Sequence, residues 1–331
     1  MIVATGVGSM PGTDAAAYLE AVTVVVDELP DLPHLPELPG RGPQADLTGR
    51  TLAVVAELGA DLQPAGWRLT GAGTAGVDHR RARSLLAQDL DVVEEQLQGY
   101  AGVFKIQVAG PWTLAATVER PRGDRALGDY GARRELAEAL AEGVRGHLAD
   151  VHRRLPDAEL VVQVDEPALP AVLAGTIPTA SGLRRHRSVD APAASPALEH
   201  IFAAVSDSSA LPIAHCCAKD VPIGLLAGAG AAGVSVDLGV LQPAAYDDLA
   251  SLLENEAPVH LGVVPATGPA PGDSTRSTIE RVLRFLEMVG LDPGSAASLA
   301  ITPSCGLAGA DRDQARRALR LVHSVAAELR D

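Results

Sequence analysis

Val161-Val162-Gln163-Val164 is an almost continuously apolar and β-branched run, and Asp165-Glu166-Pro167 follows it directly. A strand exposed on one face alternates apolar and polar residues, whereas a strand covered on both faces is apolar nearly throughout. This stretch therefore predicts a buried strand of a parallel sheet that ends in two acids.

The same order of a short apolar run, a turn and a longer helical stretch repeats along the chain. The predicted strands are residues 2–7, 66–70, 103–108, 160–164, 212–215, 233–237, 259–263 and 299–302. The predicted helices between them include 85–97, 129–155, 222–230, 244–253, 275–289 and 312–329. Helix 129–155 is the clearest, because Leu136, Leu140 and Val144 share one face.

Eight β/α units in about this length indicate an α/β protein with the (β/α)8 TIM-barrel fold. No change of composition marks a second domain, so residues 1–331 are expected to form a single domain. The proline-rich stretch 29–43 is interpreted as a long loop that crosses near the mouth of the barrel, or else as a plain surface connection.

Composition and charge disfavour some binding partners and indicate a cellular location. The formal net charge is −15, which disfavours nucleic acid as a partner. No uninterrupted apolar run is long enough to span a membrane, and the N-terminus does not read as a signal peptide. Three cysteines in 331 residues do not form a disulfide framework, so a reducing cytoplasm is the expected location.

Polar residues collect where the predicted strands end. Ser9 follows the first strand and Trp112 the third, Asp165 and Asp237 close the fourth and sixth, and Cys305 follows the eighth. TIM-barrel enzymes place their chemistry on this rim. An active site at this rim is therefore expected, although Asp165 has the alternative role of a structural acid that caps a turn.

The fifth strand runs into His215-Cys216-Cys217. His215 and Cys217 are two residues apart, so in an extended segment they point the same way, while Cys216 points into packing. Together with Cys305 and an acid on the sixth strand, they make a donor set that suits zinc better than magnesium or calcium. Ligands from three strand ends favour a catalytic ion, with a closed structural zinc and a buried core pair as the alternatives.

These residues resemble a known family. Val162–Leu169, His215-x-Cys217 and Pro303-x-Cys305-Gly306-Leu307 together are similar to the catalytic barrel of cobalamin-independent methionine synthase. Gly8-Ser9-x-Pro11 and Gly110-Pro111-x-Thr113-Leu114 fit the same family, in the same order along the chain. The last stretch also resembles uroporphyrinogen decarboxylase and the corrinoid methyltransferases of the same superfamily.

The resemblance implies a zinc-dependent methyltransferase of methionine biosynthesis that methylates a thiol, with homocysteine as the thiol. His215, Cys217 and Cys305 would be zinc ligands, and Asp237 would stand where the family has a glutamate ligand. Asp165 would hold the amino group of homocysteine, as catalytic and substrate-binding residue. Ser9 would contact its carboxylate end. Trp112 is a candidate wall of the donor pocket, or else a packing residue.

The sequence departs from the family pattern in three respects. Residues 63–68 lack the second amine-binding glutamate, and residues 264–267 lack the catalytic histidine, which Thr267 would replace. No counterpart of the additional N-terminal barrel of the full-length enzymes is expected in these 331 residues, which resemble the shorter single-barrel enzymes. A methyl-corrinoid, free or protein-bound, is therefore expected as the donor beside methyltetrahydrofolate.

Two other functions are considered. A metal-free, uroporphyrinogen decarboxylase-like enzyme would need arginines at the mouth, and Arg41, Arg50 and Arg68 are the candidates. A non-catalytic barrel that binds zinc or a corrinoid would explain the missing histidine and glutamate.

Overall fold

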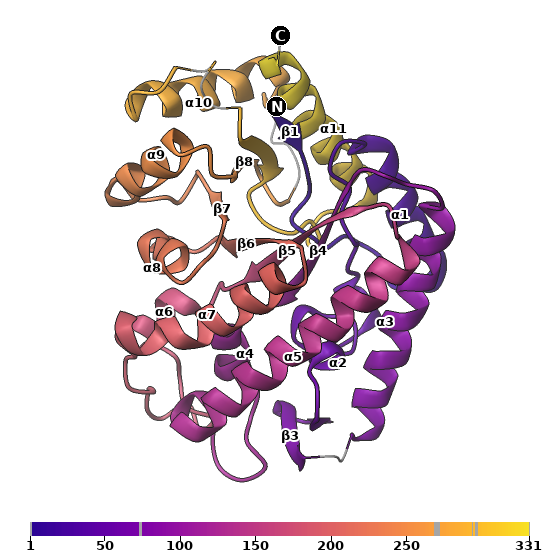
Figure 1. Cartoon of the computed structure of the whole chain (residues 1–331), viewed down its shortest axis with the longest axis vertical. Helices are drawn as coiled ribbons and strands as arrows, with labels where there is room; N and C mark the ends of the chain where they lie inside the picture. The colour runs from indigo at the N-terminus through magenta and orange to yellow at the C-terminus, as the bar shows by residue number, and fades with distance from the viewer. Residues whose placement is uncertain (1, 73–74, 268–271, 293, 295–296, 331) are drawn as a thin grey trace.

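The computed structural model describes residues 2–72, 75–267, 272–292, 294 and 297–330. Seven parallel strands form one curled sheet in the order β1-β9-β8-β7-β6-β5-β4, and helices surround it (Figure 1). The strands are β1 (Val3–Ala4), β4 (Val103–Ala109), β5 (Glu159–Asp165), β6 (Leu211–Cys216), β7 (Gly233–Asp237), β8 (Val259–Val264) and β9 (Leu299–Pro303).

The described helices follow the strands in an alternating order that confirms the predicted α/β class. They are α1 (Ala15–Glu28), α2 (Leu47–Val54), α3 (Val77–Gln96), α4 (Pro111–Thr117), α5 (Tyr130–Arg154), α6 (Leu169–Leu173), α7 (Ala191–Asp207), α8 (Ile223–Gly228), α9 (Tyr246–Glu254), α10 (Thr275–Met288) and α11 (Arg312–Arg330). Short 3-10 helices occupy Pro39–Arg41, Ala126–Gly128 and Pro243–Ala245. None of the described helices is long and apolar enough to cross a membrane.

Burial on both faces explains the apolar sequence of β5. Val162 and Val164 point to one face and Gln163 and Asp165 to the other, and all four are buried. The predicted helix 129–155 is likewise confirmed as α5. The side chain of Asp129 caps its first turn by accepting a hydrogen bond from the Ala132 N–H at 2.9 Å.

The prediction for the second strand is wrong. Residues 66–70 belong to β3 (Gly66–Ala72), which pairs antiparallel with β2 (Leu58–Gln63) in a separate two-stranded hairpin. The sequence carries a sign of this, because Trp67 and Leu69 are buried and alternate with polar or small residues. Such alternation is typical of antiparallel strands that face solvent on one side.

Residues 33–37, here called the bridge segment, lie between β4 and the chain that follows β1. The Leu35 N–H donates to the Lys105 carbonyl and the Lys105 N–H to the Pro33 carbonyl, while Glu37 exchanges hydrogen bonds with Gly8 and Met10. Pro33 and Pro36 have no N–H to donate, so this segment forms isolated parallel bridges instead of a regular strand. The stretch read as a crossing loop thus adds to the edge of the sheet.

Distant parts of the chain meet at β1. Val3 pairs with Ala300 of β9, and α11 packs against β1, so the two ends of the chain lie close together (Figure 1). The guanidinium of Arg330 also donates to the Ile2 carbonyl. The sheet is therefore completed by residues from opposite ends of the sequence.

Buried His147 of α5 predicts a loss of stability in acid. Burial, followed by the charge of Arg50, lowers the pKa of His147 to about 4, against about 6.5 in an unfolded chain. Between pH 6.5 and pH 4 the imidazole is therefore protonated in the unfolded state but not in the folded state. The free energy of unfolding falls over this range as the pH decreases. We expect His147→Gln to reduce the loss of unfolding free energy between pH 7.5 and 5.0, measured by urea denaturation, by about 2 kcal/mol. An equal loss in the variant and the wild type would contradict this.

Candidate active site

Three side chains from β6, the residue after it and the turn after β9 meet at the carboxyl ends of the strands. His215 and Cys217 lie two residues apart, and Cys305 follows β9. One ligand atom from each, the imidazole nitrogen and the two sulfurs, lies within 4.8 Å of the others. The predicted proximity of these residues is confirmed, and they are called the His-Cys-Cys group below.

The neighbouring strand orients the imidazole of this group. His215 pairs in register with Ser235 of β7, and its Nδ1 lies 2.9 Å from the Ser235 hydroxyl oxygen. A hydrogen bond to one ring nitrogen fixes the ring and leaves the other nitrogen available as a ligand. Ser235 was not singled out from the sequence, because a serine inside a valine-rich strand carries no distinct signal.

The two adjacent cysteines have different environments, as predicted. Cys216 is 1% exposed and belongs to the hydrophobic core, and burial raises the pKa of its thiol to about 12. Cys217 is partly exposed, and its sulfur lies 3.2 Å from that of Cys305. The alternation of side chains along an extended chain therefore separates a packing thiol from an accessible one.

The Cys217–Cys305 contact favours one thiolate. The hydrogen bond with Cys217, followed by the contact with His215, lowers the pKa of Cys305. The same hydrogen bond, with burial second, raises the pKa of Cys217. Two sulfurs that share one proton beside an imidazole form a soft, electron-rich site of the kind that binds thiophilic metal ions.

The His-Cys-Cys group opens into a pocket with a volume of about 170 Å³, called the rim pocket below. Ser9, Glu37 and Asp165 also line it. Gly306 permits the close approach of Ser9, because a Cβ at position 306 would lie 2.0 Å from the Ser9 hydroxyl oxygen. The pocket thus combines two thiols and an imidazole with two carboxyl groups and a hydroxyl group.

Asp165 is held by a chain of buried hydrogen bonds. Its Oδ1 accepts from the Gln163 side-chain amide at 2.7 Å, and Gln163 Oε1 accepts from Lys105 Nζ at 2.7 Å. Both Lys105 and Gln163 also donate to the Val7 carbonyl at 2.9 Å. Burial raises the pKa of Asp165 and lowers the pKa of Lys105. The carboxyl group is thereby fixed in position, with its second oxygen outside this chain of bonds.

Glu37 is a site residue that the sequence reading missed. It ends the bridge segment and is 4% exposed. Its Oε1 accepts from Gln107 Nε2 at 3.0 Å and lies 3.6 Å from Arg50 Nε. Burial raises the pKa of Glu37, with the charge of Arg50 opposing it. The sequence offers only a weak signal for it, because Glu37 is one of two acids, with Asp31, in the proline-rich stretch 29–43.

Glu166 anchors α4 rather than facing the pocket. Its carboxylate accepts from the backbone N–H groups of Trp112 and Thr113 at 2.9 and 2.8 Å, and from the Thr113 hydroxyl at 2.7 Å. A negative group at a helix N-terminus is favoured by the helix dipole. Gly110 is required here, since a Cβ would lie 2.3 Å from Glu166 Oε1.

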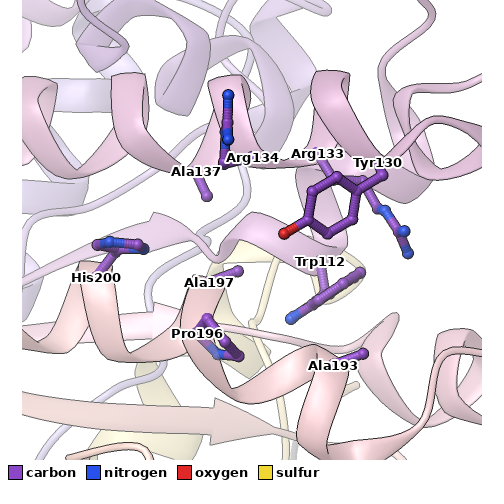
Figure 2. A pocket seen from close by; sticks show the side chains of 9 residues that line it. All are labelled: Trp112, Tyr130, Arg133, Arg134, Ala137, Ala193, Pro196, Ala197 and His200. Atoms are coloured by element: carbon purple, nitrogen blue, oxygen red, sulfur yellow. The ribbon is translucent and has the colours of Figure 1, made fainter.

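Two predicted site residues, Asp237 and Trp112, are not among the residues that line the rim pocket. Asp237 ends β7, and its Oδ1 accepts from the Gly239 N–H at 2.8 Å. The indole of Trp112 lines a different pocket, between α5 and α7 (Figure 2), and donates to the Ala194 carbonyl at 3.0 Å. Asp237 as fourth ligand and Trp112 as donor-pocket wall stay predictions.

The arginines considered for a decarboxylase are engaged in ion pairs. Arg41 and Arg50 both bind the buried Asp89, Arg41 through two hydrogen bonds of 2.8 and 2.6 Å. Arg68 is paired with Glu119. A charge neutralised in this way is not available to bind a substrate with several carboxylates.

Comparison with known proteins gives a family match. Residues 100–328 match the family described as the catalytic domain of cobalamin-independent synthase. No curated protein sequence matches the chain.

Among solved structures, a B12-independent methionine synthase from Shewanella sp. W3-18-1, in complex with selenomethionine, is similar with a TM-score of 0.65 at 12% identity. The match covers 100% of this chain and 98% of that one. A GH138 enzyme targeting pectin rhamnogalacturonan II has a TM-score of 0.47 at 11% sequence identity, and the match covers 99% of this chain and 39% of that one. SrfJ from Salmonella typhimurium has a TM-score of 0.46 at 10% identity, and the match covers 99% of this chain and 74% of that one.

Proposed function

The chain belongs to the family of cobalamin-independent synthase catalytic domains, and on that premise we propose that it is a zinc-dependent methyltransferase that converts homocysteine to methionine. The observation that supports this best is the convergence of His215, Cys217 and Cys305 in a pocket that also holds Asp165 and Glu37. A thiophilic donor set beside acidic groups fits a substrate with a thiol at one end and an ammonium group at the other.

The His-Cys-Cys group fits a catalytic zinc ion by its chemistry. One imidazole and two thiols are ligands that zinc prefers, and three protein ligands leave a coordination position for substrate. When bound, zinc would supply deprotonation of the substrate thiol at neutral pH. His215, Cys217 and Cys305 would hold the ion, with the Ser235 hydroxyl fixing the imidazole.

The acidic side of the pocket would bind the ammonium group of homocysteine. Gln163 fixes Asp165 through one carboxyl oxygen, so the other is available as an acceptor. Glu37 lines the same pocket from the bridge segment and would supply the second acid that residues 63–68 lack. A substrate cation would also favour the ionised form of both acids, whose pKa values burial raises. Ser9 would donate to the substrate carboxylate.

The energetic role of these residues is chiefly to align the reactants. A free thiol with a pKa of about 8.5 is about 3% ionised at pH 7. Full ionisation therefore gains only about thirtyfold in rate, or about 2 kcal/mol. In-line placement of sulfur, methyl group and leaving group contributes more. In the transfer, the S–CH3 bond forms as the donor–CH3 bond breaks, and the electron pair of that bond stays with the donor.

Substitution of adjacent cysteines tests the metal site. Cys217→Ala and Cys305→Ala are expected to weaken zinc binding by roughly a hundredfold or more, because each removes a ligand. Cys216→Ala is the matched control, since its thiol is buried in the core, and should bind zinc like the wild type. Competition with a chromogenic chelator measures the affinity. Equal affinity in all three variants would exclude this group as the site.

A comparison of methyl donors tests the reaction. Zinc-loaded protein is incubated with homocysteine and either methylcobalamin or methyltetrahydrofolate, and methionine is quantified. We expect turnover with methylcobalamin, since residues 264–267 lack the histidine of the folate-dependent enzymes. Zinc binding without methionine from either donor would instead indicate a non-catalytic zinc or corrinoid-binding barrel.

A substrate analogue without an amino group distinguishes an ammonium-binding role of Asp165 from a general loss of activity. Asp165→Asn is expected to raise the KM for homocysteine by roughly thirtyfold or more, because a charge-assisted hydrogen bond contributes about 2 kcal/mol or more. With 4-sulfanylbutanoate, which lacks the amino group, variant and wild type should have the same KM. A similar loss with both thiols would rule out an ammonium-binding role.

A further inference from the structure

A second pocket, called the α5–α7 groove below, lies between helices α5 and α7 (Figure 2). Its volume is about 150 Å³. The indole of Trp112 and small apolar side chains of α5 and α7 line it, namely Ala137, Ala193, Pro196 and Ala197. None of its lining residues belongs to the rim pocket. The groove is therefore a separate site with one aromatic wall.

The charge of the groove is opposite to that of the chain. The protein has a formal net charge of −15, yet the lining includes Arg133, Arg134 and His200 and no acidic residue. Figure 2 shows Arg133 beside Tyr130 and Trp112, whereas the side chain of Arg134 points away from the groove. A basic recess on an acidic protein concentrates small anions.

Arg133 differs from the arginines that form ion pairs. Its guanidinium carbon lies 5.5 Å from the ring centroid of Trp112 and 5.7 Å from that of Tyr130. Within the described part of the chain it forms no ion pair, and its buried Nε has no hydrogen-bond partner. Its neighbour Arg134 is paired with Glu138 at 3.6 Å. A buried donor without a partner is costly, and cation–π contacts with the two rings hold the guanidinium in place.

We propose that the α5–α7 groove binds a small aromatic carboxylate. A cavity of roughly 150 Å³ is of the size that holds one benzene ring. The ring would lie against Trp112 and the alanines, and the carboxylate would accept hydrogen bonds from Arg133, whose planar fork matches that group. This proposal does not depend on the methyltransferase reaction.

The position of Trp112 links this site to the rim pocket. The Trp112 backbone N–H donates to Glu166, which is adjacent to Asp165. An occupant that rests on the indole therefore contacts the helix whose N-terminus is tied to the end of β5. The groove is therefore connected to Asp165 through Trp112, its hydrogen bond to Glu166, and the peptide bond between Glu166 and Asp165.

Isothermal titration with benzoate, and with benzamide as the uncharged analogue, tests the proposal. Wild-type protein should bind benzoate saturably and benzamide at least about tenfold more weakly. Arg133→Gln should lose this discrimination. Ala197→Leu, which fills the groove, should weaken both ligands. Arg153→Gln, which replaces an arginine of the same helix paired with Asp150, should behave as wild type.

Folding of each variant is verified by circular dichroism before titration, so that loss of binding reports on the groove. Absence of saturable benzoate binding by the wild type up to roughly 10 mM would overturn the proposal. Equal binding of benzoate by wild type and Arg133→Gln would overturn it as well. If Arg133→Gln still preferred benzoate over benzamide while Arg153→Gln did not, the carboxylate would bind elsewhere on α5, and the proposal would be overturned.

Discussion

The buried side-chain amino group of Lys105 is the constraint around which the inner face of the sheet is arranged. Lys105 is fully buried, and a buried charge must be hydrogen-bonded or lose its proton. Lys105 Nζ donates hydrogen bonds to the Val7 carbonyl and to Gln163 Oε1, and the side-chain amide nitrogen of Gln163 in turn donates to Asp165. One chain of bonds thus connects β4, β5 and the residues after β1, and it ends at the carboxyl group of the rim pocket.

A second set of charges supports Glu37, the other acid of this pocket. Asp89 of α3 binds Arg41 and Arg50, and Arg50 in turn lies beside Glu37 of the bridge segment. Because every member is nearly buried, removing one would leave an uncompensated charge. Glu37 is therefore held by electrostatics from α2 and by Gln107 of β4, which explains how a segment with two prolines keeps a defined position.

The structure could be predicted from the sequence where it depends on a periodic pattern of side chains or on the positions of strand ends. Seven of the predicted strands, helix α5, and the meeting of His215 with Cys217 and Cys305 follow from side-chain alternation and from the parallel sheet. The sequence was insufficient where tertiary packing selects among irregular segments. Nothing local distinguishes Glu37 from a loop acid, and Trp112 follows a strand end yet turns its indole toward α7. Whether the sheet closes into a complete barrel stays a prediction.

The pairing of β1 with β9 has a consequence for how the molecule is assembled. Val3 and Ala300 are neighbours in the sheet but are separated by nearly the whole sequence. Contacts of such long separation form late, because the entropy of closing the intervening loop has to be overcome first. During synthesis on the ribosome, β1 has no partner on this side until β9 has emerged, so the earliest-made strand is among the last to be incorporated.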